Sequence, residues 1–336
     1  MMDQASQLRG MIEEIRNGTV GADGFSCASS VPAGVVSYAP KTHHDAMSNR
    51  RSDRPLPQSR VRLANAITIC SGKGGVGKSN VAVNLAVVLS RLGNKVCLLD
   101  ADLGMANADV LCNLSPRRTL EHVVNGQCEL AEVALLAPGG FRLIPGGSGV
   151  VRLANMPQAR RLALLRQLSI IDRTADYIII DTSAGLNANV LGFAASANRV
   201  LVITTPEPTS VTDAYGMIKV LWRQFPEIRI EIVVNLVESE AEGREVFARI
   251  DRVCRTFLRS SPRWGGYLPI DSQVAEAVRM RVPFTLFSPD GAATKSLQII
   301  ANRLTGNELE PSRTERGFFS RLISRFSTDS RHSCSI

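Results

Sequence analysis

Between residue 63 and about residue 305, short apolar runs alternate with longer stretches in which apolar residues recur every three or four positions. The runs are dense in Ile, Val and Leu at consecutive positions, which is typical of strands covered on both faces. Alternating strands and helices favour a parallel sheet with right-handed crossovers. The sequence therefore predicts one α/β domain with a doubly wound, mainly parallel sheet. The predicted strands are 66–70, 96–99, 141–144, 177–180, 200–204 and 230–234.

The chain before this domain has a different pattern. Residues 3–16 place four apolar residues at helical spacing, whereas residues 17–62 are rich in Gly, Ser, Pro, Asn and Arg without periodicity. A helix on a long flexible tether suits the capture of a partner, and a frayed terminus is the alternative. We therefore expect a helix at 1–16, a flexible linker at 17–62, the domain at 63–305 and a tail at 306–336.

The composition is compatible with several classes of binding partner and does not distinguish between them. The 336 residues are 44% hydrophobic and carry a formal net charge of +8. This basic balance fits nucleic acid, an anionic membrane, or a merely solvated basic surface. No apolar run approaches the roughly 18–20 residues that cross a bilayer, and the start of the chain lacks a signal-peptide pattern. We therefore expect a cytoplasmic protein.

The seven cysteines are scattered along the chain and form no CxxC pair. Cys70 and Cys97 lie inside predicted strands, where a free thiol behaves as a small hydrophobe. This spacing argues against a disulfide framework and against a zinc or iron–sulfur site, and it fits a reduced compartment.

A glycine-rich segment, GKGGVGKS, joins the predicted strand to a predicted helix at 80–92. It has the GxxxxGK[ST] pattern in the strand–loop–helix context of a phosphate-binding loop. Glycines allow backbone N–H groups to form an anion nest, and the helix N-terminus adds its positive dipole end. Lys78 is predicted to span the β- and γ-phosphates of ATP, and Ser79 to coordinate Mg²⁺. The predicted nucleotide-binding residues here are Gly72, Lys73, Gly74, Gly75, Val76, Gly77, Lys78, Ser79 and Asn80.

Acidic residues follow two other predicted strands, at the edge where ligands bind in open α/β sheets. Asp100 and Asp102 follow one strand, and Asp181 follows another in a sequence typical of a Walker B strand. Asp181 is predicted to hold Mg²⁺ through water, and the Gly185 N–H to contact the γ-phosphate. Helix capping is the alternative role for each aspartate.

Two residues are predicted to lie beside the base of the nucleotide. Asn235 ends the predicted strand 230–234, and its amide offers the donor and the acceptor that suit the edge of adenine. Asp271 follows an apolar segment that we interpret as a turn, and we expect it to flank the nucleotide.

A second lysine, Lys73, follows the first glycine of the loop. This deviant Walker A motif resembles that of the MinD/ParA ATPases. The resemblance implies an ATP-sandwich homodimer in which Lys73 of each subunit reaches the phosphates of the other, as an arginine finger does. It also implies that Lys73 and Lys78 are catalytic, that Asp102 orients the attacking water, and that Asp100 supports the Mg²⁺ shell.

Longer phrases resemble the FlhG/FleN regulators of flagellar number and placement within this family. They are DQASQLR at 3–9, DADLGMANADV at 100–110, TTPEPTSVTDAYGMIK at 204–219 and GYLPIDSQVAEAVRMRVPF at 266–284. The resemblance implies contact with flagellar C-ring components and, in some members, with a transcription regulator.

The first of these phrases looks like the motif with which FlhG-like proteins activate the GTPase FlhF. The resemblance implies that Gln4 makes a catalytic contact with FlhF and that Leu8 and Arg9 dock there, with Asp3 as part of the motif. The linker at 17–62 is longer than this family leads us to expect.

The tail contains a predicted amphipathic helix at 317–326. Arginines flank its apolar face, so the helix fits an anionic membrane interface. In MinD and FlhG, a helix of this kind binds membrane when ATP holds two copies together, which the resemblance implies here. Packing on its own domain is the alternative, and the helix can also alternate between docking in the monomer and release in the dimer. Its apolar face consists of Phe318, Phe319, Leu322, Ile323 and Phe326.

Together these features predict an ATP-hydrolysing, dimerising switch for flagellar number and placement, which associates reversibly with the inner face of the cell membrane and activates FlhF. The alternatives are a ParA-type DNA-partitioning ATPase, a cell-division MinD and a metal-cluster carrier. A DNA-binding arm would be basic without five apolar residues, and a cluster carrier needs paired cysteines. The motif at 3–9 favours the flagellar branch over MinD.

Overall fold

The computed structural model describes residues 63–102, 107–146, 158–306 and 316–328. The predicted helix at 3–16, the linker at 17–62 and the motif residues Asp3, Gln4, Leu8 and Arg9 lie outside these residues, so they and the division of the chain into domains stay predictions. Within the described residues, no helix is both long and apolar enough to cross a membrane.

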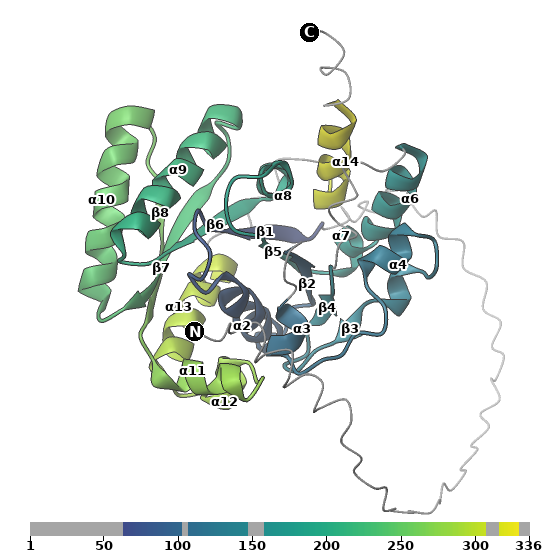
Figure 1. Cartoon of the computed structure of the whole chain (residues 1–336), viewed down its shortest axis with the longest axis horizontal. Helices are drawn as coiled ribbons and strands as arrows, with labels where there is room; N and C mark the ends of the chain where they lie inside the picture. Colours follow the sequence, from purple (N-terminus) through teal and green to yellow (C-terminus); the bar gives the residue numbers. More distant parts are fainter. Residues whose placement is uncertain (1–62, 103–106, 147–157, 307–315, 329–336) are drawn as a thin grey trace, which may run out of the picture. The chain divides into compact units, whose positions relative to one another are not determined.

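An eight-stranded sheet forms the centre of the described chain (Figure 1). Its strands lie in the order β3-β4-β2-β5-β1-β6-β7-β8, and neighbouring strands are parallel except for the edge pair β3 and β4. The carboxyl ends of the parallel strands therefore meet at one edge, with β1 in the middle. The strands are β1 (Asn65–Cys70), β2 (Val96–Ala101), β3 (Leu135–Leu136), β4 (Arg142–Ile144), β5 (Tyr177–Thr182), β6 (Arg199–Thr204), β7 (Ile230–Val237) and β8 (Arg263–Pro269).

Helices cover both faces of this sheet (Figure 1). One face packs against α2 (Lys78–Arg91), α3 (Ala108–Leu111), α11 (Ser272–Arg279), α12 (Phe284–Phe287) and α13 (Ala292–Gly306). The other face packs against α4 (Leu120–Val124), the 3₁₀ turn η1 (Leu130–Glu132), α6 (Gln158–Leu168), α7 (Ile171–Thr174), α8 (Ala188–Ser196), α9 (Pro208–Gln224), α10 (Glu240–Leu258) and α14 (Phe318–Thr328).

The alternation of side chains along each strand explains this two-sided core. In β1, Ile67 and Ile69 belong to the cluster under α2 and α13, whereas Ala66 and Cys70 belong to clusters on the opposite face. Successive strand residues point to opposite faces of a sheet, so a strand that is apolar at every position needs helices on both sides. The α/β, doubly wound, mainly parallel fold predicted from the sequence is confirmed.

All six predicted strands are present, and each starts within one residue of its predicted start. The sequence does not predict β3 or β8, because β3 has two residues and β8 contains a tryptophan and two glycines in place of a dense aliphatic run. Two details of the prediction are wrong. Asn235 lies within β7, which continues to Val237, and Asp271 follows the strand β8 and not a turn.

Candidate nucleotide-binding site

The loop at 72–79 connects the central strand β1 to α2 at the carboxyl edge of the sheet. Gly75 and Gly77 have φ of 78° and 89°, in the left-handed region that glycine adopts without strain. Gly77 is the N-cap of α2, so the helix begins at Lys78, two residues before its predicted start. The Lys78 side chain is buried there. A glycine-rich turn that enters a helix in this way supplies the backbone N–H groups and the dipole end of an anion site.

The remaining loop residues surround this helix start. Val76 is buried, whereas Gly74 and Gly75 are exposed. Ser79 and Asn80 are half-buried on the first turn of α2. The structure therefore places all nine predicted residues, 72–80, in a loop and the first turn of α2 that follows it.

Gly72 packs directly against the backbone of α9. A Cβ atom at this position would lie 2.3 Å from the Asp213 carbonyl oxygen, whereas the nearest atom to a Cβ at Gly74 is 4.0 Å away, on Ala184. We expect Gly72→Ala to displace the loop and to weaken ATP binding by roughly 1–3 kcal/mol. Gly74→Ala is the matched control and should change the binding free energy by less than about 0.5 kcal/mol. Calorimetric titration with ATP measures both, and equal affinities would contradict the packing argument.

Lys73 is held by the start of α9. Its Nζ lies 2.5 Å from Glu207 Oε1 and 3.0 Å from Thr209 Oγ1, and the Thr209 hydroxyl donates to the same Glu207 oxygen over 2.8 Å. The hydrogen bond from Lys73 lowers the pKa of Glu207. Glu207 lies within the family phrase at 204–219 but is not among the predicted site residues. Its position just after the carboxyl end of β6 and before a helix N-terminus is the signal that could have found it.

Two buried carboxylates stand side by side at the carboxyl edge. Asp100 in β2 and Asp181 in β5 are register partners across the parallel pair, and they are 1% and 0% exposed. The Asp100 oxygens accept hydrogen bonds from the backbone N–H groups of Asp102 and Ala108, over 3.1 and 3.2 Å. Among the described residues, neither Asp181 oxygen has a hydrogen-bond partner. A buried carboxylate left in this state indicates a missing cationic or water partner.

Both carboxylates have raised pKa values for the same main reason. Burial raises the pKa of Asp100 to about 6, against the lowering effect of the two backbone N–H groups. Burial, and then the charge of Asp100, raise the pKa of Asp181 to about 7, although nearby Ser79 and Lys78 lower it. A divalent cation would reverse this pattern, because it stabilises the charged form of both groups.

These residues fit Mg²⁺. Mg²⁺ prefers hard oxygen ligands, keeps several of its waters and is held by one or two carboxylates together with phosphate oxygens. Asp181, Asp100 and the Ser79 hydroxyl offer that donor set beside the phosphate loop, and Asp181 has accepting capacity to spare. In this arrangement Ser79 would touch the ion directly, and the two carboxylates would hold its waters.

The raised pKa values predict a pH dependence of stability. Between the ordinary pKa near 3.8 and about 7, the folded chain binds more protons at Asp181 than the unfolded chain does, so its stability falls as pH rises through this window. Mg²⁺ competes with those protons, so we expect added Mg²⁺ with ADP to raise the melting temperature more at pH 8 than at pH 5.5. Scanning calorimetry at both pH values tests this. The variant Asp181→Asn should lose the difference, and an equal Mg²⁺ effect at the two pH values in the unmodified chain would contradict the assignment.

The other predicted site residues lie at the same edge with backbone partners. The Asn235 Nδ2 donates to the Val76 carbonyl over 2.9 Å, which brings it against the loop. The Gly185 N–H, predicted to contact the γ-phosphate, donates to the Ser71 carbonyl over 2.9 Å. Asp102 is half-buried directly after β2. A base contact by Asn235 and a water-orienting role for Asp102 stay predictions.

Asp271 has a capping role that was not predicted. Its Oδ1 accepts from the Gln273 N–H over 3.0 Å as the N-cap of α11, and its Oδ2 accepts from the Ala293 N–H of α13 over 3.2 Å. These bonds join the starts of two helices after β8. The predicted contact of Asp271 with nucleotide stays a prediction.

The described cysteines behave as apolar residues. Cys70, Cys97, Cys112 and Cys254 are buried free thiols, and burial raises the pKa of each to about 12. Cys128 is half-buried. The described residues contain no group of three or more His, Cys, Asp or Glu side chains arranged for a metal ion.

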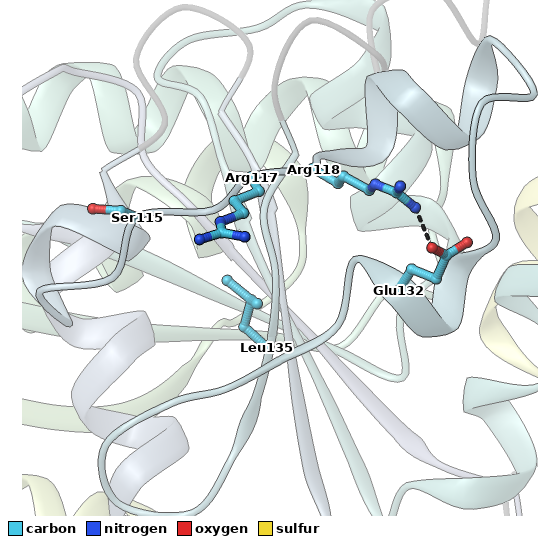
Figure 2. A pocket seen from close by; sticks show the side chains of 5 residues that line it. All are labelled: Ser115, Arg117, Arg118, Glu132 and Leu135. Carbon is cyan, nitrogen blue, oxygen red and sulfur yellow. Dashed lines mark hydrogen bonds and ion pairs between the residues drawn. The ribbon is translucent and has the colours of Figure 1, made fainter.

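A hollow of about 460 Å³ lies elsewhere, beside the edge strand β3 (Figure 2). It is lined by Ser115, Arg117, Arg118, Glu132 and Leu135, and Arg118 forms an ion pair with Glu132. None of the residues predicted for nucleotide, metal, partner or membrane contact lines it.

The C-terminal helix α14 is docked on the domain. Phe318, Phe319 and Leu322 are each 0% exposed and belong to the core cluster that also contains residues of β2, β5, α6 and α8. Phe318 stacks on Phe193 of α8, with ring centroids 6.4 Å apart and an interplanar angle of 16°. The described part of the predicted membrane face is therefore inside the protein in this state. The side chains of Ile323 and Phe326 lie outside the description.

Polar contacts hold the N-terminal half of the docked helix. The carboxylate of Asp172 in α7 accepts from the N–H groups of Phe318 and Phe319 over 2.9 and 3.1 Å. Burial raises the pKa of Asp172 to about 6, against the lowering effect of these N–H groups. Arg321 donates to the Ser196 carbonyl and to Asn198 Oδ1 over 2.9 and 3.0 Å. These bonds give α14 a specific seat on the domain.

Comparisons with known proteins identify the family of this chain. A family model named ParA, described as NUBPL iron-transfer P-loop NTPase, matches residues 62–305. The antiactivator FleN of Pseudomonas aeruginosa is 41% identical over 239 residues, which cover 71% of this chain and 85% of FleN. The flagellum site-determining protein YlxH of Helicobacter pylori is 33% identical over 263 residues, which cover 76% of this chain and 89% of YlxH.

Solved structures agree on the fold. The septum site-determining protein MinD of Pyrococcus horikoshii, complexed with Mg-ADP, matches with a TM-score of 0.59 at 21% identity, over 76% of this chain and all of MinD. The sequence contains no CxxC pair. The chain belongs to the MinD/ParA family of P-loop NTPases, in which the FlhG/FleN flagellar regulators are its relatives.

Proposed function

We propose that this protein is an ATP-hydrolysing, dimerising switch that controls flagellar number and placement. The observation that carries the proposal is a phosphate loop in which Lys73 is a second cation, held by Glu207, while Lys78 and Ser79 lie near the buried Asp181. The identity of 41% to FleN and of 33% to YlxH supports the flagellar assignment. The Mg-ADP complex of the related MinD supports ATP and Mg²⁺ as ligands.

The residues at the carboxyl edge of the sheet divide the catalytic roles. The loop N–H groups and Lys78 bind the phosphates, and Ser79 with Asp100 and Asp181 holds Mg²⁺ and its waters. Asp102 orients the attacking water. Lys73 leaves Glu207 and reaches the phosphates of a second copy, where it stabilises the charge of the transition state. The active form is therefore a homodimer with ATP between the subunits, and hydrolysis requires assembly.

The membrane contact is made by α14 after it leaves its seat. Burial of Phe318, Phe319 and Leu322 contributes roughly 4–9 kcal/mol to the free energy of docking. Insertion of the same side chains into lipid removes them from water to a similar extent and contributes a similar free energy. The preference for the docked or the membrane-bound state is therefore set by the polar contacts. The bonds of Asp172 and Arg321 favour docking, and contacts of the arginines with anionic headgroups favour the membrane. Two helices held in one dimer bind more strongly through effective concentration, so ATP favours the membrane-bound form.

The N-terminal motif at 3–9, which begins with Asp3, activates the GTPase FlhF through Gln4, with Leu8 and Arg9 docking it, and the domain contacts flagellar C-ring components. The family phrase at 3–9 supports this part of the proposal. The protein is cytoplasmic and reversibly peripheral on the inner face of the cell membrane. A ParA-type partitioning role would require salt-dependent DNA binding by the ATP form, which a filter-binding assay at two salt concentrations tests directly.

Sizing and liposome pelleting of the full chain test the switch. With ATP and Mg²⁺ we expect a dimer that pellets with vesicles containing anionic phospholipid, and with ADP a monomer that stays in the supernatant. Asp102→Ala should bind ATP but not hydrolyse it, so it should remain dimeric and membrane-bound with ATP for many turnover times of the unmodified protein. If this variant is monomeric with ATP, or releases from vesicles as fast as the unmodified chain, the role of Asp102 is wrong.

A further inference from the structure

Two helices, α8 and α9, run from the nucleotide edge of the sheet to the docked helix α14. Each follows a strand whose carboxyl end lies at the nucleotide edge, so each returns toward the opposite edge, where Asp172 holds the start of α14. Either helix could therefore report the state of the nucleotide site to α14, and the contacts at their ends decide between them.

The N-terminal end of α8 is attached to the phosphate loop. The Gly185 N–H donates to the carbonyl of Ser71, the residue just before the loop. Two residues later, Asn187 caps α8 by accepting from the Val190 N–H over 3.0 Å, and its amide donates to Ser183 Oγ over 2.9 Å. The segment between Asp181 and α8 is thus bonded to Ser71 at Gly185 and closed on itself by the bond from Asn187 to Ser183, and Gly185 is the predicted γ-phosphate contact.

The C-terminal half of α8 contacts α14 through two residues. Phe193, 1% exposed, stacks on Phe318, and the Ser196 carbonyl accepts from Arg321 Nε over 2.9 Å. Asn198, two residues beyond the helix, accepts from Arg321 Nη2 and also from the Ala66 N–H of β1. These contacts are buried or half-buried, so a change in the tilt of α8 cannot occur without breaking or rebuilding them.

The route through α9 is weaker at its far end. Its N-terminal end holds Lys73 through Glu207, and its C-cap Phe225 meets α14 at the Arg325 guanidinium, which lies 4.7 Å from the ring centroid. This contact is a cation–π interaction of a half-buried arginine and adds no backbone bond to α14.

We propose that α8 transmits the nucleotide state of the phosphate loop to α14, through the contacts of Phe193 and Ser196 with Phe318 and Arg321. This rests on the proposed ATP-dependent function and names the element that regulates it. When ATP draws the Gly185 N–H away from Ser71, α8 tilts as a rigid rod of nine residues, about 13 Å long. Its far end then loosens Arg321 and Phe318, while Asp172 keeps the start of α14 until the helix leaves.

Hydrogen–deuterium exchange of the peptide 316–328 in the full chain, without lipid, tests the route. In the unmodified chain, a non-hydrolysable ATP analogue with Mg²⁺ should raise exchange by about tenfold, equivalent to roughly 1.4 kcal/mol of docking free energy. Arg321→Ala should exchange fast without nucleotide and should respond little to the analogue. Arg325→Ala, one helical turn away on the same helix, is the matched control and should respond as the unmodified chain does.

The variant Phe193→Leu tests the same route from the α8 side, because it keeps an apolar side chain but loses the ring stack, and it should reproduce the result of Arg321→Ala.

Two outcomes would overturn the proposal. One is an unreduced increase in exchange when the analogue is added to Arg321→Ala. The other is loss of that increase in Arg325→Ala alone, which would assign the route to α9. Calorimetric titration of the same samples distinguishes failure of nucleotide binding from failure of the coupling through α8. If the analogue does not bind, the proposed ATPase function fails; if it binds and exchange in the unmodified chain is unchanged, only the coupling through α8 fails.

Discussion

Lys73→Ala is expected to bind ATP with nearly the affinity of the unmodified protein and to hydrolyse it at least about 10³-fold more slowly, the lower end of what a cation supplied in trans contributes to phosphoryl transfer. The physical reason is that Lys73 is not part of the helix start that forms the phosphate nest. Its ammonium group is bound at the start of α9, 2.5 Å from Glu207 Oε1, so it must move before it can reach a phosphate group. Single-turnover hydrolysis and nucleotide titration of the same sample measure the two effects separately.

Glu207→Gln is the matched control for this variant. It removes the ion pair and keeps the lysine, so hydrolysis should persist in it. A Lys73→Ala protein that hydrolyses ATP at the unmodified rate would refute catalysis in trans, and one that no longer binds ATP would show that the Lys73 side chain binds the nucleotide of its own subunit.

Phe318→Ala is expected to lower the free energy of unfolding by about 3–5 kcal/mol, the range for truncating a fully buried phenylalanine. The side chain is 0% exposed between Phe193 and Phe319 in the docked state, so its removal leaves a cavity that the ring stack cannot close. Urea unfolding followed by fluorescence and by circular dichroism measures the change.

Phe257→Ala is the control, because Phe257 on α10 is 72% exposed and its loss should cost less than about 0.5 kcal/mol. If the two variants are equally stable, α14 does not contribute to the stability of the domain, and the docked helix is a minor state in solution. The sequence left two roles open for Phe318, a membrane contact and packing on the domain, and only the second of them predicts this loss of stability.

The chemistry of the nucleotide site could be predicted because it is local. The loop at 72–79 has a fixed spacing that only a strand–turn–helix can use, and aliphatic runs before Asp100 and Asp181 place both carboxylates at strand ends. The adjacency of those two strands was not predictable in this way. It follows from the sheet order, in which β5 separates β2 from β1 although the three are far apart in sequence.

The contacts that a sequence pattern cannot predict are the ones between distant segments. Glu207 meets Lys73 across 134 positions, and Asp172 meets the start of α14 across 146. No periodicity marks such a pair, because neither residue type nor spacing specifies a partner that the fold brings from elsewhere. The same limit explains why Asp271 is read as a nucleotide contact and is found as the cap of α11.

The sequence by itself determined the α/β fold, the phosphate loop with its two lysines, and an amphipathic helix near the end of the chain. Each of these is specified by residues close together in the sequence, whose backbone preferences and periodicity act within one or two elements. Only the tertiary structure decided that Phe318, Phe319 and Leu322 of the apolar face of that helix are buried, because an apolar stripe can pack against lipid or against a protein core. The docked position is stabilised by the bonds of Asp172 with Phe318 and of Arg321 with Ser196 and Asn198. The two residues of each pair lie more than 120 positions apart in the sequence.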